Sequence, residues 1–389
     1  MNIKSLLLGS AAVLVAVSGA RAADAVVIAE PEPAEYVRVC DVYGAGFYYM
    51  PGTETCIKIG GYVRYQYNFN GNAKLDTGAG DFGGGYDAVS RVRGRLNFDI
   101  REETDLGTLR GFVRLQAQNT NGSDANFQMT QAYLQLAGLT AGYYDSLWTS
   151  DIGGADDGLL TDTDLAVGDV TANVLSYTYA VDGITGTLSV ENPVFTDTGE
   201  EFPGGPSVSE NSIDVVGKVA YSGAWGGAYV AAVYDGEADY YGAPSDLGEG
   251  TAFKGGLWVT DLLMADSTFK IEGTYALDET DFATVDSVLV GDALPLLWTA
   301  GAGYSFGFGD FSFAFAGRYG QTFDDVLVAG GDPIDVYNLV GNIGYDITDN
   351  LGLLTEISYE HLDIPAVAGS TVDATEGTTS GFVRLQRSF

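Results

Sequence analysis

The last twelve residues, Thr378–Phe389 (TTSGFVRLQRSF), alternate between apolar and polar side chains. One parity holds Val383, Leu385 and Phe389, and the other holds Arg384, Gln386 and Ser388. A strand of this kind shows an apolar face to one side and a polar face to the other, as a barrel wall in lipid does around a water-filled interior. We therefore predict that this segment is a strand of a membrane barrel and that Phe389 is its C-terminal assembly signal.

The same two-residue period recurs along most of the chain, interrupted at short intervals by clusters of Gly, Asp, Asn or Thr. This pattern is typical of many antiparallel strands. We predict sixteen strands, at Ile57–Phe69, Ala88–Arg101, Thr108–Asn119, Phe127–Leu136, Leu139–Tyr144, Ala172–Ala180, Ile184–Glu191, Ser212–Tyr221, Trp225–Tyr234, Ala252–Thr260, Thr268–Leu277, Leu296–Gly307, Asp310–Gly320, Asp335–Ile347, Asn350–Glu360 and Thr378–Phe389.

The links between these strands alternate in length. After even-numbered strands they are short, as at Ala137-Gly138, and after most odd-numbered strands they are long and acidic, as at Asp278–Pro295 and His361–Gly377. Bacterial outer-membrane barrels have short periplasmic turns, long external loops and an even number of strands. The sequence therefore predicts an all-β fold, a 16-stranded antiparallel transmembrane β-barrel, whereas a soluble β-sandwich would not be expected to sort its loops in this way.

The first residues are typical of an export signal. Lys4 precedes the apolar stretch Leu6–Val17, and Ala20 and Ala22 supply the small residues that a signal peptidase requires. We predict a signal peptide over residues 1–22, a periplasmic-side lead-in over residues 23–56 and the transmembrane barrel over residues 57–389. A membrane anchor helix is the alternative, although the apolar stretch falls short of the roughly 20 residues that a helical span needs.

The composition excludes some functions. With 18 Lys and Arg against 53 Asp and Glu, the formal net charge is −35, which argues against nucleic-acid binding. Cys40 and Cys56 are the only cysteines, and an exported chain permits a disulfide between them, with two free thiols as the alternative. We expect no metal site, because His361 is the only histidine, and no cofactor.

Basic residues gather on the first three predicted strands. In RVRGRLNFDIR, Arg91, Arg93 and Arg95 share one parity and apolar residues occupy the other. Adjacent strands lie about 4.8 Å apart, so the basic side chains of neighbouring strands form one patch. Facing lipid would cost about 2–4 kcal/mol for each arginine near the midplane, so we place the patch on the inner wall. The predicted basic wall comprises Lys58, Arg64, Arg91, Arg93, Arg95, Arg110 and Arg114.

Asp145–Thr171 is the longest segment between predicted strands, and it contains no Lys or Arg. Its acidic residues are Asp145, Asp151, Asp156, Asp157, Asp162, Asp164 and Asp169. Loops of this length are usually functional or disordered. We predict that this third loop folds into the lumen and places its carboxylates opposite the basic wall, where charged groups set the ion preference of a pore. The alternative is a solvated loop outside the barrel.

Two parts of the chain carry a family resemblance: VRVCDVYGAGFYYMPGTETCIKIGGYVRYQYNF (Val37–Phe69) and the ending GFVRLQRSF. Both resemble the alphaproteobacterial general porins of the Brucella and Rhizobium type. The resemblance implies a homotrimeric outer-membrane porin for passive diffusion of small hydrophilic solutes. The family's inward-folding third loop maps onto Asp145–Thr171, and its basic wall maps onto Arg64, Arg91, Arg93, Arg95, Arg110 and Arg114. The external loops are the least family-like part, so detailed selectivity does not carry over.

We therefore expect a multi-pass protein of the bacterial outer membrane, in contact with its lipids and lipopolysaccharide, that passes ions and small hydrophilic solutes and is not an enzyme. The alternative is a structural or adhesive barrel with a closed lumen, which would need bulky apolar or plug residues inside. The arginines favour anions locally, whereas the loop aspartates and the acidic composition favour cations, and we expect a weak cation preference.

Two short patterns do not change this interpretation. Gly78, Gly80 and Gly83 have a G-x-G-x-x-G spacing, but they lie between two predicted strands rather than in a βαβ unit. We interpret them as part of a flexible external loop. His361 lies beside another predicted external loop, where it could not easily serve a buried catalytic triad.

Overall fold

A computed structural model describes residues 38–71, 74–76, 81–83, 86–123, 126–193, 213–236, 250–287, 292–324, 326, 331–364 and 374–389. The predicted signal peptide and residues 23–37 of the lead-in lie outside these residues. The described chain begins with a short 3-10 turn, η1 (Asp41–Tyr43), and the strand β1 (Tyr48–Tyr49), which pairs with the start of β2. Among the described residues, no helix has the length and apolar character needed to cross a membrane.

Eighteen strands form one antiparallel sheet, of which β1 and the short β15 are side additions and the remaining sixteen make the wall. The wall strands are β2 (Cys56–Gly71), β5 (Tyr86–Thr104), β6 (Gly107–Thr120), β7 (Asn126–Leu136), β8 (Leu139–Asp145), β9 (Thr171–Val181), β10 (Ile184–Pro193), β11 (Asp214–Gly223), β12 (Gly226–Asp235), β13 (Gly250–Thr260), β14 (Ser267–Ala276), β16 (Asp292–Phe308), β17 (Phe311–Thr322), β18 (Asp335–Thr348), β19 (Leu351–Ile364) and β20 (Ala374–Ser388).

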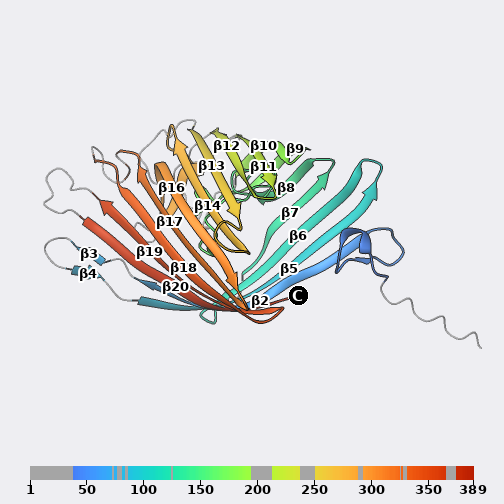
Figure 1. Cartoon of the computed structure of the whole chain (residues 1–389), viewed down its shortest axis with the longest axis horizontal. Helices are drawn as coiled ribbons and strands as arrows, with labels where there is room; N and C mark the ends of the chain where they lie inside the picture. The colour runs from blue at the N-terminus through green and yellow to red at the C-terminus, as the bar shows by residue number, and fades with distance from the viewer. Residues whose placement is uncertain are drawn as a thin grey trace, which may run out of the picture.

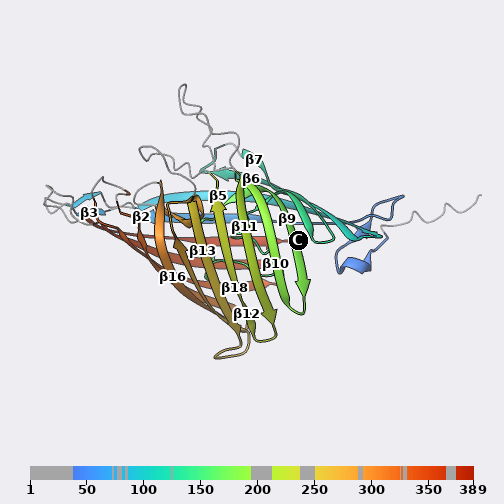
Figure 2. The same cartoon turned by 90° about the horizontal axis from the view of Figure 1, so that it is seen from above.

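The first and last wall strands pair with each other and close the barrel. The register of β2 with β20 runs from Tyr62 opposite Ser388 to Asn70 opposite Ser380. Beyond it, the backbone N–H of Phe389 donates to the carbonyl of Gly61, and the N–H of Gly61 donates back, both at 3.1 Å. Figure 1 shows the C-terminus beside β2, and Figure 2 shows β10–β13 slanting down one side of the wall. Each of the sixteen wall strands therefore pairs with a neighbour on both sides within the described residues, as a bilayer requires.

The two faces of the wall differ as the alternation predicts. On β20, Val383 and Leu385 are 42% and 41% exposed, whereas Arg384 between them is only 7% exposed. On β5, Val92 and Leu96 are exposed while Arg93 and Arg95 are half-buried. Apolar side chains therefore cover the outer face, and polar and charged side chains gather on the inner face.

Tight turns join the strands at one end of the barrel. In the β7–β8 turn, Ala137 and Gly138 have φ of 51° and 88°, and in the β9–β10 turn, Asp182 and Gly183 have φ of 51° and 81°. Positive φ at both central residues is the geometry of two-residue hairpin turns that match the twist of the strands. The short links of the sequence are thus real hairpins, and each of the sixteen predicted strands overlaps one wall strand.

Three details differ from the prediction. Several strands extend further than expected: β20 begins at Ala374 rather than Thr378, and β19 ends at Ile364 rather than Glu360. Strand pairing continues beyond the apolar alternation because backbone hydrogen bonds do not depend on the side chain. The glycine-rich segment expected to be a flexible loop contains a hairpin of β3 (Lys74–Asp76) and β4 (Asp81–Gly83), while Gly78 and Gly80 lie outside the described residues. The link before β16 holds η2 (Asp281–Ala283) and β15 (Thr284–Ser287).

Candidate lumen and its constriction loop

The segment between β8 and β9, residues 146–170, packs against several wall strands through an apolar cluster. Leu147 and Trp148 are fully buried among Val216, Val233 and Phe282. The indole N–H of Trp148 donates to the carbonyl of Val167 at 2.9 Å and ties the two ends of the segment together. We call residues 146–170 the constriction loop. Its anchoring therefore begins with ordinary burial of apolar surface.

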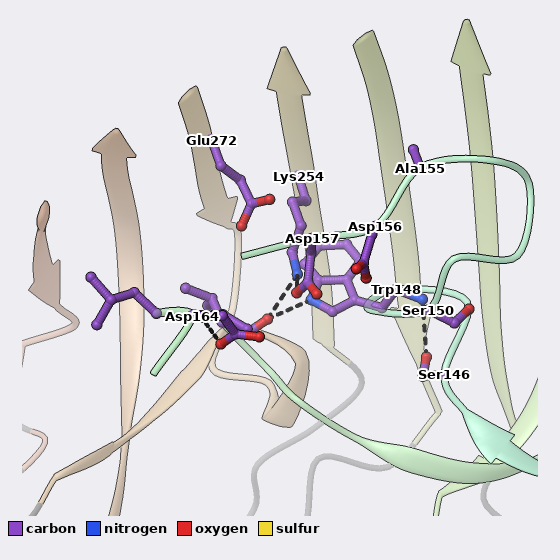
Figure 3. Close-up of polar contacts among 12 residues, drawn as sticks. Ser146, Trp148, Ser150, Ala155, Asp156, Asp157, Asp164, Lys254 and Glu272 are labelled. Atoms are coloured by element: carbon purple, nitrogen blue, oxygen red, sulfur yellow. Dashed lines mark hydrogen bonds and ion pairs between the residues drawn. The ribbon is translucent and has the colours of Figure 1, made fainter. Parts of the chain in front are cut away.

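Lys254 on β13 provides the central polar anchor of the constriction loop. Its ammonium group lies 2.9 Å from a carboxylate oxygen of Asp157 and also donates to the carbonyl of Val167 at 2.9 Å. It lies 4.6 Å from the ring centre of Trp148, within cation–π range. The side chains of Lys254 and Asp157 are 0% and 5% exposed, so this ion pair is buried. Figure 3 shows Lys254 directed from its strand toward Asp157.

Four further cations of the wall bind the constriction loop. Lys218 donates to the carbonyls of Ser150 (2.8 Å) and Ala155 (2.5 Å). Lys270 donates to the carbonyl of Asp156 at 2.7 Å, and Arg318 donates to the carbonyls of Leu165 and Ala166, both at 2.9 Å. Arg384 grips both carboxylate oxygens of Asp162 with its two terminal nitrogens. Most of these cations bind backbone carbonyl oxygens of the loop. They therefore fix the path of the loop backbone and do not only pair with its carboxylates.

Two buried carboxylates of the wall also bind the loop, and here the loop donates the hydrogen bonds and the wall accepts them. Glu356 on β19 accepts the backbone N–H groups of Asp162 and Thr163, both at 2.8 Å. Glu191 on β10 accepts the N–H of Leu147 at 2.9 Å. Both glutamates are 1% exposed. Buried charges are tolerated where donors satisfy them. The loop supplies donors to both glutamates, while Oε2 of Glu191 has no hydrogen-bond partner among the described residues.

Glycines on β16 let the constriction loop touch the wall directly. A Cβ at Gly303 would collide with the carbonyl oxygen of Leu159, and one at Gly301 would collide with the Leu159 side chain. Leu159 is 1% exposed and packs with Leu165, Ala316 and Val340. The small residues of β16 thus form the bed on which the middle of the loop rests.

The predicted basic wall is organised by amides. Arg95 donates to Gln116 (3.1 and 2.7 Å), Arg93 donates to Gln118 (2.9 and 2.5 Å), and Arg64 donates to Gln386 (2.8 Å). In the same way, Arg114 donates to Asn97 at 3.3 Å. Amide oxygens carry no net charge, so these hydrogen bonds orient the guanidinium groups without neutralising them. The wall between β20 and β6 is therefore electropositive.

Two members of the predicted basic wall lie in other surroundings. Arg110 pairs with Asp99 at 3.0 Å, and Asp99 also binds Arg101 at 2.7 Å. Lys58 is exposed near the start of β2, with its ammonium group 5.8 Å from the ring centre of Phe47. Within the described residues, neither Arg110 nor Lys58 contacts the constriction loop.

An open cavity of about 240 Å³ lies against the electropositive wall and is bordered by one residue of the constriction loop. Its lining consists of Arg64, Gln66, Arg91, Arg93, Gln118, Arg384 and one loop residue, Asp162. Arginines and one aspartate thus line the same cavity. Only Asp162 among the loop aspartates lines this cavity.

The other loop aspartates have different partners. Asp145, at the end of β8, accepts from Gln131 at 2.9 Å, and Asp151 accepts the hydroxyl of Tyr144 at 2.6 Å. Asp164 accepts the backbone N–H of Ala166 at 3.0 Å within the loop. Asp157 serves the ion pair with Lys254. Asp169 is exposed and has at least one polar interaction.

Two loop carboxylates are less acidic than usual. Partial desolvation between the loop and the wall, reinforced by the nearby charge of Asp157, raises the pKa of Asp156 to about 6. Desolvation likewise raises the pKa of Asp164 to about 6, although its hydrogen bond from Ala166 opposes the change. The charge of the constriction loop therefore changes just below neutral pH.

Cys40 and Cys56 form a disulfide, with their Cα atoms 6.1 Å apart. Both are buried with Phe47, and Tyr43 and Tyr49 pack against them. The predicted bond is thus present, and it ties the segment before the barrel to the first residue of β2.

The five cations that anchor the constriction loop were not among the residues predicted from the sequence. After position 145 the chain contains only six Lys or Arg residues: Lys218, Lys254, Lys270, Arg318, Arg384 and Arg387. Five of the six contact the loop. The sequence does contain a sign of them. Each of the five is the one basic residue on the polar side of its strand, in a part of the chain where basic residues are rare.

A closed antiparallel barrel of sixteen strands with an apolar exterior and a polar, charged interior defines a bacterial outer-membrane β-barrel. The sequence pattern of the Porin subfamily matches residues 24–382, and the chain belongs to this family of integral, multi-pass outer-membrane channel proteins. Porin Omp2b of Brucella neotomae is 32% identical over 401 aligned positions that cover all of both chains. Porin Omp2b of Brucella canis is 40% identical over 247 residues, which are 60% of this chain and 66% of that porin, just under two thirds.

Solved structures of outer-membrane proteins share the fold. The channel DcaP of Acinetobacter baumannii superposes with a TM-score of 0.60 at 13% identity, covering 88% of this chain and 99% of that one. OprB of Pseudomonas putida gives 0.55 at 10% identity, covering 85% and 94%. The trimer form of OmpT from Vibrio cholerae gives 0.51 at 12% identity, covering 87% and 100%. At such identities the likeness shows the fold alone.

Proposed function

We propose that this chain forms a water-filled channel through which ions and small hydrophilic solutes diffuse passively across the bacterial outer membrane. The observation that carries this proposal is the inner face, where arginines held by neutral amides face Asp162 of the constriction loop across an open cavity. Charges that border a water-filled gap act on ions that pass through it. The relatives are named as porins, so we propose a channel without enzymatic activity.

We propose further that the constriction loop folds into the lumen and sets its width. Five inner-face cations and two inner-face carboxylates hold the loop, which supports this position. The loop divides the wall into an electropositive side that remains open and a side that it covers. The narrowest passage then lies between Asp162 and the arginines of β2 and β5.

The alternative of an adhesive barrel with a closed lumen has less support. A closed interior would need apolar or plug residues across its whole width. The apolar clusters instead lie where the constriction loop packs on the wall, and the strands β2, β5 and β6 present Arg, Gln and Asn on their inner faces.

We propose a homotrimer in contact with outer-membrane lipids and lipopolysaccharide. The trimer form of the OmpT neighbour supports this assembly. The exposed apolar side chains of the outer face suit contact with lipid and with other copies of the chain.

Planar-bilayer recording tests the function. Purified protein should insert in steps and give an ohmic conductance that closes in triplets, since each trimer would contain three channels. Folded protein that inserts without any conductance would overturn the channel proposal and favour the closed barrel. Single rather than triple closing steps would leave the channel intact and overturn the trimer.

A further inference from the structure

Four strands of the wall place arginine and glutamine side chains in two adjacent rows on the inner face. Across β20, β2 and β5, one row pairs Arg384 with Gln66 and Gln66 with Arg91. Across β20, β2, β5 and β6, the next row runs in the order Gln386, Arg64, Arg93 and Gln118. Arginine and glutamine therefore alternate along β20 and β2 and between these two strands, whereas β5 supplies an arginine to both rows.

Each of three glutamines binds the Nε–H side of one arginine. Gln66 accepts the Nε–H of Arg384 at 2.7 Å, just as Gln386 and Gln118 accept the Nε–H groups of Arg64 and Arg93. A guanidinium group has five N–H donors in a rigid plane, and fixing its Nε edge sets the direction of the rest. These arginines line the open cavity with their orientation settled in advance.

The positive charge of this cavity is not balanced by its wall. Arg64 and Arg93 are directly opposite in register, an arrangement that is unfavourable for like charges. The Nε atom of Arg91 is buried and has no hydrogen-bond partner within the described residues. The cavity therefore combines concentrated positive charge with donor capacity that the wall does not use.

Asp162 shows which chemistry this arrangement accepts. Among the described residues that line the cavity it is the single carboxylate, and both of its oxygens contact the terminal nitrogens of Arg384. Arginine makes the same two-pronged contact with carboxylates and phosphates in general. The loop carboxylate thus occupies one of four arginines and leaves Arg64, Arg91 and Arg93 facing the gap.

We propose that this cavity is a binding subsite for a divalent oxyanion of the phosphate class and that Asp162 is its built-in competitor. Four arginines and one aspartate leave three positive charges, which a divalent anion balances better than chloride does. The volume of about 240 Å³ holds such an anion with part of its hydration, since a water molecule takes about 30 Å³ in the liquid. The subsite deepens the proposed channel function and depends on it.

Titration of single channels with inorganic phosphate tests the subsite. At pH about 8, where phosphate groups are mostly doubly charged, added phosphate should reduce the chloride-salt current in a saturable way. Chloride at equal ionic strength should not do so. A parallel titration with glycerol 2-phosphate shows whether the site takes only free phosphate or also phosphate monoesters. Saturable block of the current by either compound supports the subsite.

Substitutions locate the effect. Arg93→Gln should raise the half-blocking phosphate concentration at least about tenfold, because it removes a charge-assisted contact. Asp162→Asn should lower that concentration several-fold, because it removes the competing carboxylate. Arg101→Gln, on the same strand but paired with Asp99 away from the cavity, should leave it unchanged.

The outcomes separate the two proposals. A wild-type channel that conducts but shows no saturable block by phosphate overturns the subsite and leaves the porin function standing, whereas protein that never conducts overturns the function itself. Equal loss of block in Arg93→Gln and Arg101→Gln would assign the block to general charge and overturn the subsite. If Arg93→Gln does not fold, the wild-type titration and the opposite effect of Asp162→Asn still decide.

Discussion

The constriction loop can lie against β16 only because residue 303 is a glycine and has no side chain beyond hydrogen. Any Cβ there would strike the backbone of Leu159, and backbone cannot move aside as the end of a flexible side chain can. The strand β16 itself would tolerate alanine, because its own pairing is unaffected. The glycine is required by what lies against the strand and not by the strand.

We therefore expect Gly303→Ala to displace the constriction loop without unfolding the barrel. The single-channel conductance should rise, and amide hydrogen exchange in residues 146–170 should become faster. Gly186→Ala on β10 is the matched control, since a Cβ there meets nothing within 4 Å. Equal behaviour of the two variants would contradict the direct contact between loop and wall.

We expect Asp156 and Asp164 to make the channel sensitive to pH. With pKa values raised to about 6, both are ionised at neutral pH and lose their charge as the pH falls through about 6. We expect the preference for cations over anions, measured as the reversal potential in a salt gradient, to decrease between pH about 7 and 5. Asp156→Asn combined with Asp164→Asn should flatten this dependence, and an unchanged pH profile in that variant would contradict the assignment.

The same pKa values set the sign for the stability of the loop. A raised pKa means that the docked loop binds protons more tightly than a released loop does, so docking is favoured as the pH falls toward the ordinary carboxylate range and weakened as it rises through about 6. Hydrogen exchange in the loop should therefore be slower at pH about 5 than at pH about 7, after correction for the intrinsic rate.

The constriction loop is an element that the wall holds but does not need. Backbone hydrogen bonds of the barrel run from strand to strand, including those between β8 and β9 at either end of the loop. Replacing residues 146–170 by a short Gly-Ser link should leave the wall folded and raise the conductance several-fold. The lysines that lose their partners would then face water, which spares them the cost of an unpaired buried charge. Unchanged conductance in folded protein would show that the loop does not narrow the pore.

The disulfide secures a different element, the segment before β2. It closes a loop of 16 residues, for which the chain-entropy model gives a stabilisation of about 3 kcal/mol. Non-reduced peptide mapping by mass spectrometry should show Cys40 linked to Cys56, and replacing both by Ser should lower the urea midpoint of unfolding. Free thiols that alkylate in the folded protein would contradict the bond.

The molecule as a whole is acidic, yet its inner wall is basic on one side. Replacing Arg91, Arg93 and Arg95 by glutamine should shift the reversal potential toward cations, because the positive side of the constriction is lost. The shift should shrink as salt rises, since the Debye length falls from about 10 Å at 0.1 M to about 3 Å at 1 M. A shift that persists at high salt, or none at low salt, would contradict an electrostatic origin.

Most of the wall was predictable because its signals are local. Alternation places each strand, and positive-φ pairs such as Asp182-Gly183 mark the turns. The ends of strands were less predictable. Pairing N-terminal to Thr378, for example, depends on the partner strand and not on the side-chain pattern. The hairpin of β3 and β4 was missed because its glycines resemble an irregular loop.

The sequence by itself determined the number of strands, the apolar outer face and the inward basic parity of β5. Each depends on residue type and on spacing along the chain. Only the tertiary structure decided which charges meet. Asp157 pairs with Lys254, and Asp162 pairs with Arg384, a residue 222 positions away. Barrel closure brings such partners together, and no local pattern encodes which cation on a distant strand will face a given residue of the loop.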